Sequence, residues 1–350
     1  MGFQNVSPQI LLVKLSSLGD VLHNLPIVWD LRVRLPEARI DWVVEEAYVS
    51  LLTPLLSREG FRGIDRIIPF GLRRWKRNLF RLQTWKEFFT FKKELQAVSY
   101  DVIIETQGLL KSALVCALAH KSSNVVVSGL ANATEFSGYE PIARFFYSQS
   151  VQVPKQCHAV DRSRCVMSAA LDWSLLDRQE NPVHFYPETH VDERGPSETP
   201  KDLRILKKPY ILCFHSTARE AKRWNNGNWI SLGKSLSSKG YQIVFPWGNS
   251  SEKKISVQLA SQIEGAIVPG AFSIQEAFPI IASAALTVGV DTGLTHLAAV
   301  LGKPTIEIYC DSPRWKTEGY WSDQIINLGD IKAPPTVNAA LSASLRLLAQ

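Results

Sequence analysis

The chain has 350 residues, of which 45% are hydrophobic and 21% are charged, so it can bury cores and is not a disordered protein. Its net charge of +6 is compatible with a phosphorylated, nucleic-acid or anionic-lipid partner. The five cysteines form no C-x-x-C pair, which argues against a disulfide framework or a thiolate zinc site and fits a reducing compartment. The sequence predicts neither a membrane-spanning helix nor a secretory signal.

The first half of the chain alternates short apolar runs with longer mixed segments. Five runs rich in β-branched residues are predicted as strands: Ile10–Val13, Ile40–Glu45, Arg66–Phe70, Asp101–Thr106 and Asn124–Gly129. Because these runs are continuously apolar rather than alternating, they are typical of a parallel sheet that is covered on both faces. A helix is predicted from about Asp20, after the polar loop that follows the first strand.

A polar stretch with five prolines, between residues 181 and 209, separates the two halves and is typical of an interdomain linker. The alternation then restarts. Strands are predicted at Tyr210–Ser216, Tyr241–Gly248, Ala266–Gly270, Leu286–Asp291 and Thr305–Cys310, and helices at Trp229–Ser238, Glu252–Ile263, Thr292–Leu301 and Val337–Leu348.

We therefore predict an α/β protein of two domains, with a ligand site beyond the carboxyl ends of the strands. The first domain is predicted at residues 1–185, the linker at 186–208 and the second domain at 209–330. Residues 331–350 are predicted as a C-terminal helix that could pack back on the first domain.

Asp20 is the first candidate for chemistry. It follows the turn Lys14–Gly19 and stands at the start of the predicted helix, where N–H groups and the helix dipole keep a carboxylate ionised. Asp20 is therefore either only a helix cap or a general base at the edge where α/β folds place their reactive groups. His23 could share that face, although a lone histidine is more often structural.

A second candidate is the segment Val290–His296. Asp291 ends a predicted strand, Thr292 and Gly293 turn, and a helix begins. The Thr292 hydroxyl and the unpaired N–H groups of the first helical turn would form an anion site suited to a diphosphate. The alternative is a plain strand–turn–helix with a capping residue.

Two further segments of the second half follow strand ends. In His215–Trp224, Thr217 and Lys222 could reach a phosphate, with Lys222 as a point charge on a leaving group. The alternative for that segment is an exposed polar loop. Glu252 could accept hydrogen bonds from ribose hydroxyls, or it could only favour the start of its helix.

A basic run with interleaved aromatics occupies residues 73–93. It holds eight basic residues and one acidic residue, Glu87. The run either binds phosphates on an anionic lipid surface or forms a solvated helix face with aromatics in the core.

Several common motifs are missing from the sequence. It contains no G-x-x-x-x-G-K-[ST], G-x-G-x-x-G, G-x-S-x-G or H-E-x-x-H, which weighs against a P-loop NTPase, a nicotinamide dehydrogenase, a serine hydrolase and a zincin.

In combination, the motifs resemble those of lipopolysaccharide heptosyltransferases. The matching segments are Lys14–Pro26, Asp41–Glu46, Arg73–Lys76, Thr106–Ser112, His158–Val160, Pro246–Gly248 and Asp291–Leu297. This resemblance implies a GT-B glycosyltransferase, with two Rossmann-like α/β/α domains that face a central cleft. It implies inverting transfer of L-glycero-D-manno-heptose from ADP-heptose to Kdo of Kdo-lipid A, in lipopolysaccharide inner-core biosynthesis.

The resemblance also implies where the protein works and what it needs. It implies a cytoplasmic protein, peripheral on the inner face of the inner membrane, with no nucleic-acid partner. No cofactor is required and no metal site is implied, although an assisting divalent metal stays open.

Roles of single residues follow from the same resemblance. Asp20 matches the catalytic base, and Lys222 matches a group that contacts the leaving phosphate. The implied donor-binding residues are Thr217, Lys222, Glu252, Phe272, Asp291, Thr292, Gly293 and His296. The implied acceptor-binding residues are Ser17, Gly19, Arg73, Arg74, Lys76, Arg77, Gln107 and Lys111. The chain departs from the family pattern at Ala218, where a second hydroxyl is common, and at Phe272, where a methionine is common.

Three alternatives to this function stay open. Within the family, the acceptor could be a first heptose, although the Arg73–Lys76 motif favours Kdo. A nucleotide-sugar epimerase could share the fold and the donor site. A non-catalytic binder of anionic lipid or nucleic acid would use only the basic run and would leave both strand–turn–helix anion sites unexplained.

Overall fold

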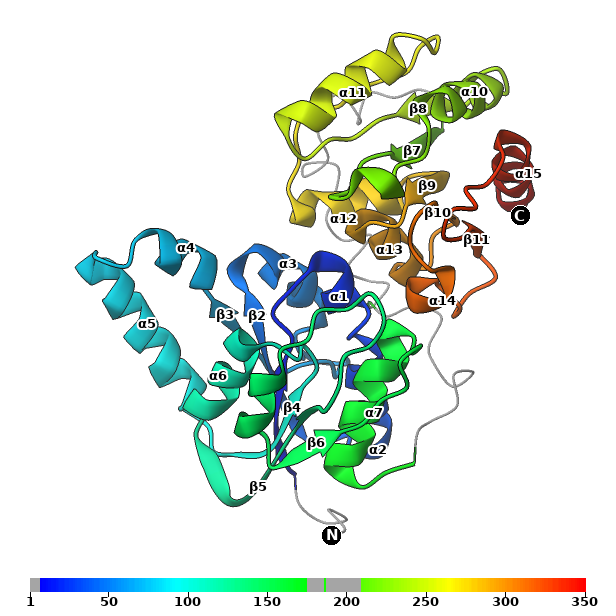
Figure 1. Ribbon diagram of the computed structural model, residues 1–350. Coiled ribbons are helices and arrows are strands. Elements are labelled where there is room, and N and C mark those ends of the chain that lie inside the picture. Colours follow the sequence, from blue (N-terminus) through cyan, green and yellow to red (C-terminus); the bar gives the residue numbers. More distant parts are fainter. Residues whose placement is uncertain (1–6, 175–185, 187–208) are drawn as a thin grey trace. The chain divides into compact units, whose positions relative to one another are not determined.

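The structure is a computed structural model, and it describes residues 7–174, 186 and 209–350 (Figure 1). The chain divides into two compact units, Met1–Asn181 and Pro182–Gln350. Except for Tyr186, the linker predicted at 186–208 lies outside the described residues. None of the helices that the model describes is long and apolar enough to cross a membrane.

The first unit is built on a six-stranded parallel sheet in the order β3-β2-β1-β4-β5-β6. Its strands are β1 (Gln9–Val13), β2 (Arg39–Glu45), β3 (Arg66–Phe70), β4 (Tyr100–Glu105), β5 (Lys121–Leu130) and β6 (Gln149–Val151). The five predicted strands are confirmed. β6 was not predicted, because its three residues contain no apolar run.

Helices cover both faces of this sheet (Figure 1). They are α1 (Leu18–Leu22), α2 (Pro26–Arg34), α3 (Val49–Leu52), α4 (Leu72–Arg77), α5 (Leu82–Leu95), α6 (Leu110–Leu118) and α7 (Ala159–Leu171), with short 3₁₀ turns η1 (Glu46–Tyr48), η2 (Thr53–Leu55) and η3 (Pro141–Phe146). Phe91 of α5 and Cys116 of α6 pack in one core with Leu11, Val13 and Ile103 of the sheet. Helices α2 and α7 pack against each other on the opposite face.

The second unit is built on a five-stranded parallel sheet in the order β11-β10-β9-β7-β8. Its strands are β7 (Tyr210–Phe214), β8 (Gln242–Val244), β9 (Leu286–Val290), β10 (Thr305–Tyr309) and β11 (Ile325–Gly329). The prediction of a strand at Ala266–Gly270 is wrong. Only Ile267 forms a bridge, with Val244, and Pro269 cannot donate a ladder hydrogen bond.

The helices of the second unit agree with the predicted alternation. They are the 3₁₀ turn η5 (Glu220–Lys222), α10 (Asn226–Ser237), α11 (Ser250–Ala260), α12 (Ile274–Ala282), α13 (Gly293–Val300), α14 (Arg314–Thr317) and α15 (Val337–Leu348). Within the second unit α15 packs on α10, and its Ala340 and Leu347 join the core beside Trp229. That this helix could also pack back on the first domain stays a prediction.

Candidate active site

Asp20 lies at the third position of α1, directly after the turn that follows β1. The backbone N–H and the hydroxyl of Ser17 each donate a hydrogen bond of 2.9 Å to Oδ2 of Asp20, so the carboxylate caps its own helix. No described residue donates a hydrogen bond to Oδ1. The cap therefore uses one carboxylate oxygen and leaves the other available to a substrate hydroxyl.

Two buried cations hold Asp20 in its ionised form. Burial alone would raise the pKa of Asp20, but the charges of Lys14 and Arg162 and the hydrogen bonds from Ser17 lower it well below its usual range. Lys14 follows β1 and is 1% exposed, and Arg162 on α7 is 5% exposed. Arg162 was not predicted, since nothing in the sequence relates α7 to the β1 turn.

The turn that carries Asp20 is held by residues predicted to bind the acceptor. Oε1 of Gln107 accepts hydrogen bonds of 3.2 Å from the backbone N–H groups of Leu15 and Ser16. Nζ of Lys111 donates to the Ser16 hydroxyl at 3.0 Å and to Oε1 of Glu45 at 2.9 Å. The structure therefore brings Gln107 and Lys111 to the same turn as Ser17 and Gly19.

Glu45, at the end of β2, links this turn to the basic run. Its buried carboxylate forms ion pairs with Lys111 and with Arg73, whose Nε lies 2.7 Å from Oε2 of Glu45. Arg74 points to other partners, because it pairs with Glu46 and Glu87. Arg73 thus lies near the Asp20 turn, whereas Arg74 ties α4 to η1 and α5.

The remaining predicted acceptor residues, Lys76 and Arg77, are exposed on α4. Within residues 7–174 neither forms an ion pair. The aromatic side chains of the basic run fall into two groups. Trp75 and Phe91 are buried in the core, as expected of a solvated helix face, whereas Trp85 and Phe89 are 51% and 60% exposed, as expected of a lipid-binding surface.

The second cluster gathers around Asp291, at the carboxyl end of β9. Lys222 of η5 donates to Oδ2 of Asp291, and Nε2 of His296 lies 3.0 Å from Oδ1. The Thr317 hydroxyl also donates to Oδ1, at 3.3 Å, and the Thr217 hydroxyl donates to the Asp291 carbonyl at 3.4 Å. Four of the predicted donor residues are therefore in contact.

His296 lies between two buried carboxylates. Its Nδ1 is 2.8 Å from Oε1 of Glu307. The other oxygen of Glu307, Oε2, accepts hydrogen bonds from the Tyr309 hydroxyl and the Gly319 N–H. Burial would lower the pKa of His296, but the negative charges of Glu307 and Asp291 raise it to about 10. The imidazolium therefore donates from both ring nitrogens at neutral pH, and it helps to keep the pKa of Asp291 well below its usual range.

The helix N-terminus beside Asp291 has no side-chain cap. Thr292 is the N-cap residue of α13, and its hydroxyl makes no capping hydrogen bond. The first N–H groups of a helix need an external partner, and an anion is a favourable one. Thr292 and Gly293 thus lie where the sequence predicts an anion site, next to the Lys222 ammonium group.

Glu252 and Phe272 both belong to the second unit. Oε2 of Glu252, in the first turn of α11, accepts a hydrogen bond of 2.7 Å from the Gly248 N–H, which leaves Oε1 for another donor. Phe272 is half-buried in the segment before α12. No hydrogen bond among the described residues links either side chain to Asp291.

Sequence reasoning missed the groups that complete both clusters, namely Glu45, Arg162, Glu307, Tyr309 and Thr317. One signal was available for Glu307, because it is the only charged residue of the otherwise apolar and aromatic strand Thr305–Tyr309. A carboxylate buried in that position needs a partner.

Comparison with known proteins shows the family to which the chain belongs. The model of glycosyltransferase family 9 (heptosyltransferase) matches residues 88–344. Lipopolysaccharide heptosyltransferase 1 of Pseudomonas aeruginosa is 33% identical over 327 residues, which are 93% of this chain and 85% of the relative.

Solved structures agree with this match. The Escherichia coli heptosyltransferase WaaC with ADP is 29% identical, with a TM-score of 0.79 over 97% of this chain and 99% of that chain. The same enzyme with ADP-2-deoxy-2-fluoro heptose is 30% identical, with a TM-score of 0.74 over 95% of this chain and 98% of that chain. The predicted GT-B-like fold and the predicted resemblance are confirmed: the chain belongs to glycosyltransferase family 9, the heptosyltransferases.

Proposed function

We propose that the protein is an inverting heptosyltransferase that moves L-glycero-D-manno-heptose from ADP-heptose to Kdo of Kdo-lipid A. The observation that carries this proposal is the cluster around Asp291, where a carboxylate for sugar hydroxyls lies beside the Lys222 cation and an uncapped helix N-terminus. This combination suits a nucleotide diphosphate sugar, because cations and helix N-termini stabilise phosphate groups. The names of the relatives support heptose as the sugar.

In the proposed reaction, a Kdo hydroxyl attacks the anomeric carbon of heptose on the face opposite the diphosphate. The new C–O bond forms as the bond to the diphosphate breaks, and the hydroxyl proton passes to Asp20. Because the pKa of Asp20 is low, the carboxylate takes this proton only once the attacking oxygen has gained positive character. Such a base contributes on the order of 10²–10⁴-fold to the rate.

The electron pair of the broken bond leaves with ADP. Lys222, Thr217 and the N–H groups of α13 meet its growing charge, and Asp291 with His296 holds the heptose hydroxyls. Glu252 would bind the ribose and Phe272 would contact the adenine. In this proposal the cation and the helix dipole stabilise the leaving group, so the reaction requires no cofactor.

The acceptor would bind on the first unit, around the turn that carries Asp20. Kdo carries a carboxylate, and Arg73 and Lys111 offer cations beside that turn. We propose that the protein works as a peripheral protein on the inner face of the inner membrane, where its exposed basic residues meet anionic headgroups.

The test is incubation with ADP-heptose and Kdo-lipid A, followed by mass measurement of the lipid. We expect a gain of one heptose. If heptose is transferred only to a lipid that already carries one heptose, the acceptor is that first heptose and not Kdo. Conversion of ADP-heptose without any acceptor would support an epimerase instead.

Asp20→Asn is the matched variant, since the amide oxygen of asparagine can still accept the Ser17 hydrogen bonds but cannot take the proton. Transfer should fall by about 10²–10⁴-fold while ADP binding stays unchanged. Full transfer activity in this variant would remove Asp20 from the role of base.

A further inference from the structure

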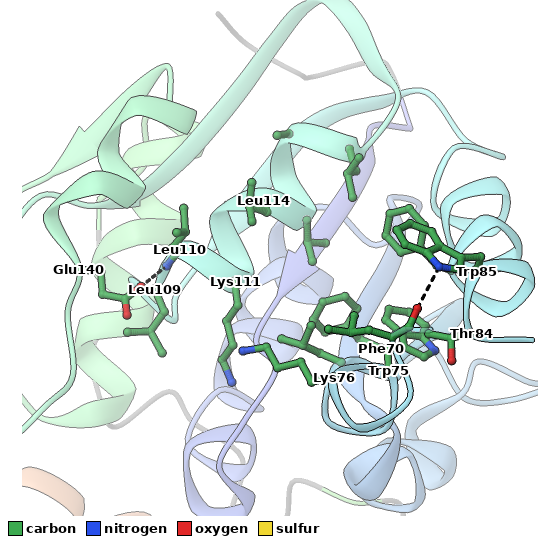
Figure 2. A pocket seen from close by; sticks show the side chains of 16 residues that line it. Phe70, Trp75, Lys76, Thr84, Trp85, Leu109, Leu110, Lys111, Leu114 and Glu140 are labelled. Atoms are coloured by element: carbon green, nitrogen blue, oxygen red, sulfur yellow. Dashed lines mark hydrogen bonds between the residues drawn. The ribbon is translucent and has the colours of Figure 1, made fainter. Parts of the chain in front are cut away.

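An apolar pocket in the first unit is not used by the proposed reaction. It has a volume of about 840 Å³ and lies between α4, α5 and α6 (Figure 2). Apolar side chains form most of its wall, among them Trp75, Leu79, Trp85, Leu110 and Leu114. This size is within the range of about 300–1,000 Å³ that is usual for small-molecule sites.

Two indole N–H groups and one hydroxyl in the wall are already bonded within the protein. The Trp85 indole donates to the Leu79 carbonyl at 3.0 Å, a contact drawn in Figure 2, and the Trp75 indole donates to Glu87 at 3.2 Å. The Thr84 hydroxyl donates to the Asn78 carbonyl at 2.8 Å. These donors therefore need no hydrogen-bond acceptor from a bound molecule, so this part of the pocket suits hydrocarbon rather than a polar ligand.

One end of the pocket holds two lysines, Lys76 and Lys111, and Lys111 is paired there with Glu45. The Glu140 carboxylate also lines the pocket and accepts a hydrogen bond from the Leu110 N–H. Figure 2 shows the amino groups of Lys76 and Lys111 directed toward each other at that end. Lys111 also donates to Ser16, in the turn that carries Asp20. This end thus adjoins the proposed acceptor site, and an occupant with an anionic head and an apolar tail matches both ends.

Several large apolar side chains around the pocket are exposed among the basic residues of this segment. Trp85 is 51% exposed and Leu114 is 44% exposed, although both line the wall. Phe80, in the turn between α4 and α5, is fully exposed, and Leu82, the first residue of α5, is 80% exposed. Apolar side chains exposed in such a group mark a binding surface.

We propose that this pocket binds one fatty acyl chain of the acceptor lipid, while the anionic sugar head lies at Lys111 and the Asp20 turn. The inference rests on the proposed function and adds an acyl-chain subsite to it. The pocket would then select acceptors by their lipid part and present the sugar to Asp20 in one orientation. The acceptor lipid is the occupant that fits best, because Lys111 both lines the pocket and donates a hydrogen bond to Ser16 in the turn that carries Asp20.

The experiment compares acceptors that share the Kdo sugars and differ only in acyl chain length, all below their critical micelle concentrations and without vesicles. We expect KM to fall with each methylene that the pocket buries, by up to about fourfold, which is the fold-change that corresponds to about 0.8 kcal/mol. We expect kcat to change little. Equal KM values for deacylated and acylated acceptors would overturn the proposal while leaving the proposed heptosyl transfer intact.

Leu114→Glu places a charge in the pocket wall at a half-exposed position. It should raise KM for the acylated acceptor by at least about tenfold and leave KM for the deacylated acceptor unchanged. Leu82→Glu is the matched control, since Leu82 is exposed but does not line the pocket. If Leu82→Glu has the larger effect, or if chain length matters only on vesicles, the apolar surface inserts into the membrane and the pocket proposal is wrong.

A binding measurement keeps the test independent of transfer. A dodecyl phosphate brominated near the end of its chain should quench tryptophan fluorescence saturably, because Trp75 and Trp85 line the pocket. Leu114→Glu should abolish this quenching and Leu82→Glu should preserve it. Absence of saturable quenching in the unmodified protein would overturn the acyl-chain site even if heptose transfer is observed.

Discussion

Replacing His296 by glutamine tests the charge arrangement around Asp291. His296 is 3% exposed, and its ring nitrogens lie 3.0 Å from Asp291 and 2.8 Å from Glu307. Glutamine can still form a hydrogen bond, but it carries no charge. The substitution leaves two buried carboxylates with only the Lys222 ammonium group as a bonded cation.

The size of the effect follows from the pKa of His296, which the fold raises from 6.5 to about 10. One pKa unit corresponds to about 1.36 kcal/mol, so the bound proton contributes about 5 kcal/mol to the free energy of unfolding below pH 6.5. The contribution is about 4 kcal/mol at pH 7, and it is lost as the pH rises through 10. Breaking a buried ion pair costs about 3–5 kcal/mol, in agreement with this value.

Urea unfolding at several pH values measures this contribution. His296→Gln should lower the free energy of unfolding by about 4 kcal/mol at pH 7, and the difference from the unmodified protein should shrink toward pH 10. Glu307→Gln and the double variant complete a cycle, whose coupling energy should be about 1–3 kcal/mol. A loss below about 1 kcal/mol for His296→Gln, or additive effects in the cycle, would refute a charged His296 between two carboxylates.

Three other changes give measurable results. Arg162→Met removes a charge that lowers the pKa of Asp20, so the acidic limb of the kcat/KM profile should move to higher pH by about 1 pH unit or more. Arg162→Lys keeps the charge and is the control. An acidic limb that does not move in Arg162→Met contradicts this role of Arg162. Burial and the charge of Arg223 lower the pKa of His215 to about 4, so the free energy of unfolding should fall by about 3 kcal/mol between pH 6.5 and pH 4. Calorimetry should show this loss in the unmodified protein and not in His215→Gln. Gln107→Leu removes the hydrogen bonds that hold the Asp20 turn and should lower kcat by about 10²-fold with ADP binding unchanged. Gln107→Glu keeps the accepting oxygen and should retain more of kcat. Equal kcat values for the two variants would exclude a positioning role for Gln107.

The sequence was sufficient for most of the two sheets, because their strands are continuously apolar. Nine of the ten predicted strands are present, and the error at Ala266–Gly270 arose because an apolar run there contains a proline. The unpredicted strands β6 (Gln149–Val151) and β11 (Ile325–Gly329) lie at sheet edges, where most of their residues are partly exposed. Edge strands carry a weaker apolar signal, since only part of their surface is covered.

From the residues alone, the candidate site could be predicted best in the turns and helix starts that follow a strand. Asp20 and Asp291 stand after β1 and β9, and parallel sheets place reactive groups at that edge. Their charge partners come from other parts of the chain: Arg162 belongs to α7, and Glu307 belongs to β10. No local pattern relates these segments, because the contacts exist only after the helices pack on the sheets.

Buried carboxylates within apolar strands nevertheless carry a usable signal. Glu45, Glu105 and Glu307 lie in β2, β4 and β10, and each of these residues is less than 5% exposed. A carboxylate is costly to bury without partners, so each of these residues predicts cations or donors close to it. The structure contains them: Lys111 pairs with Glu45, His296 pairs with Glu307, and backbone N–H groups with the Tyr147 hydroxyl donate to Glu105. An acidic residue in such a strand therefore indicates which part of the sheet edge holds an ordered charge cluster, even when the sequence does not show which residues complete it.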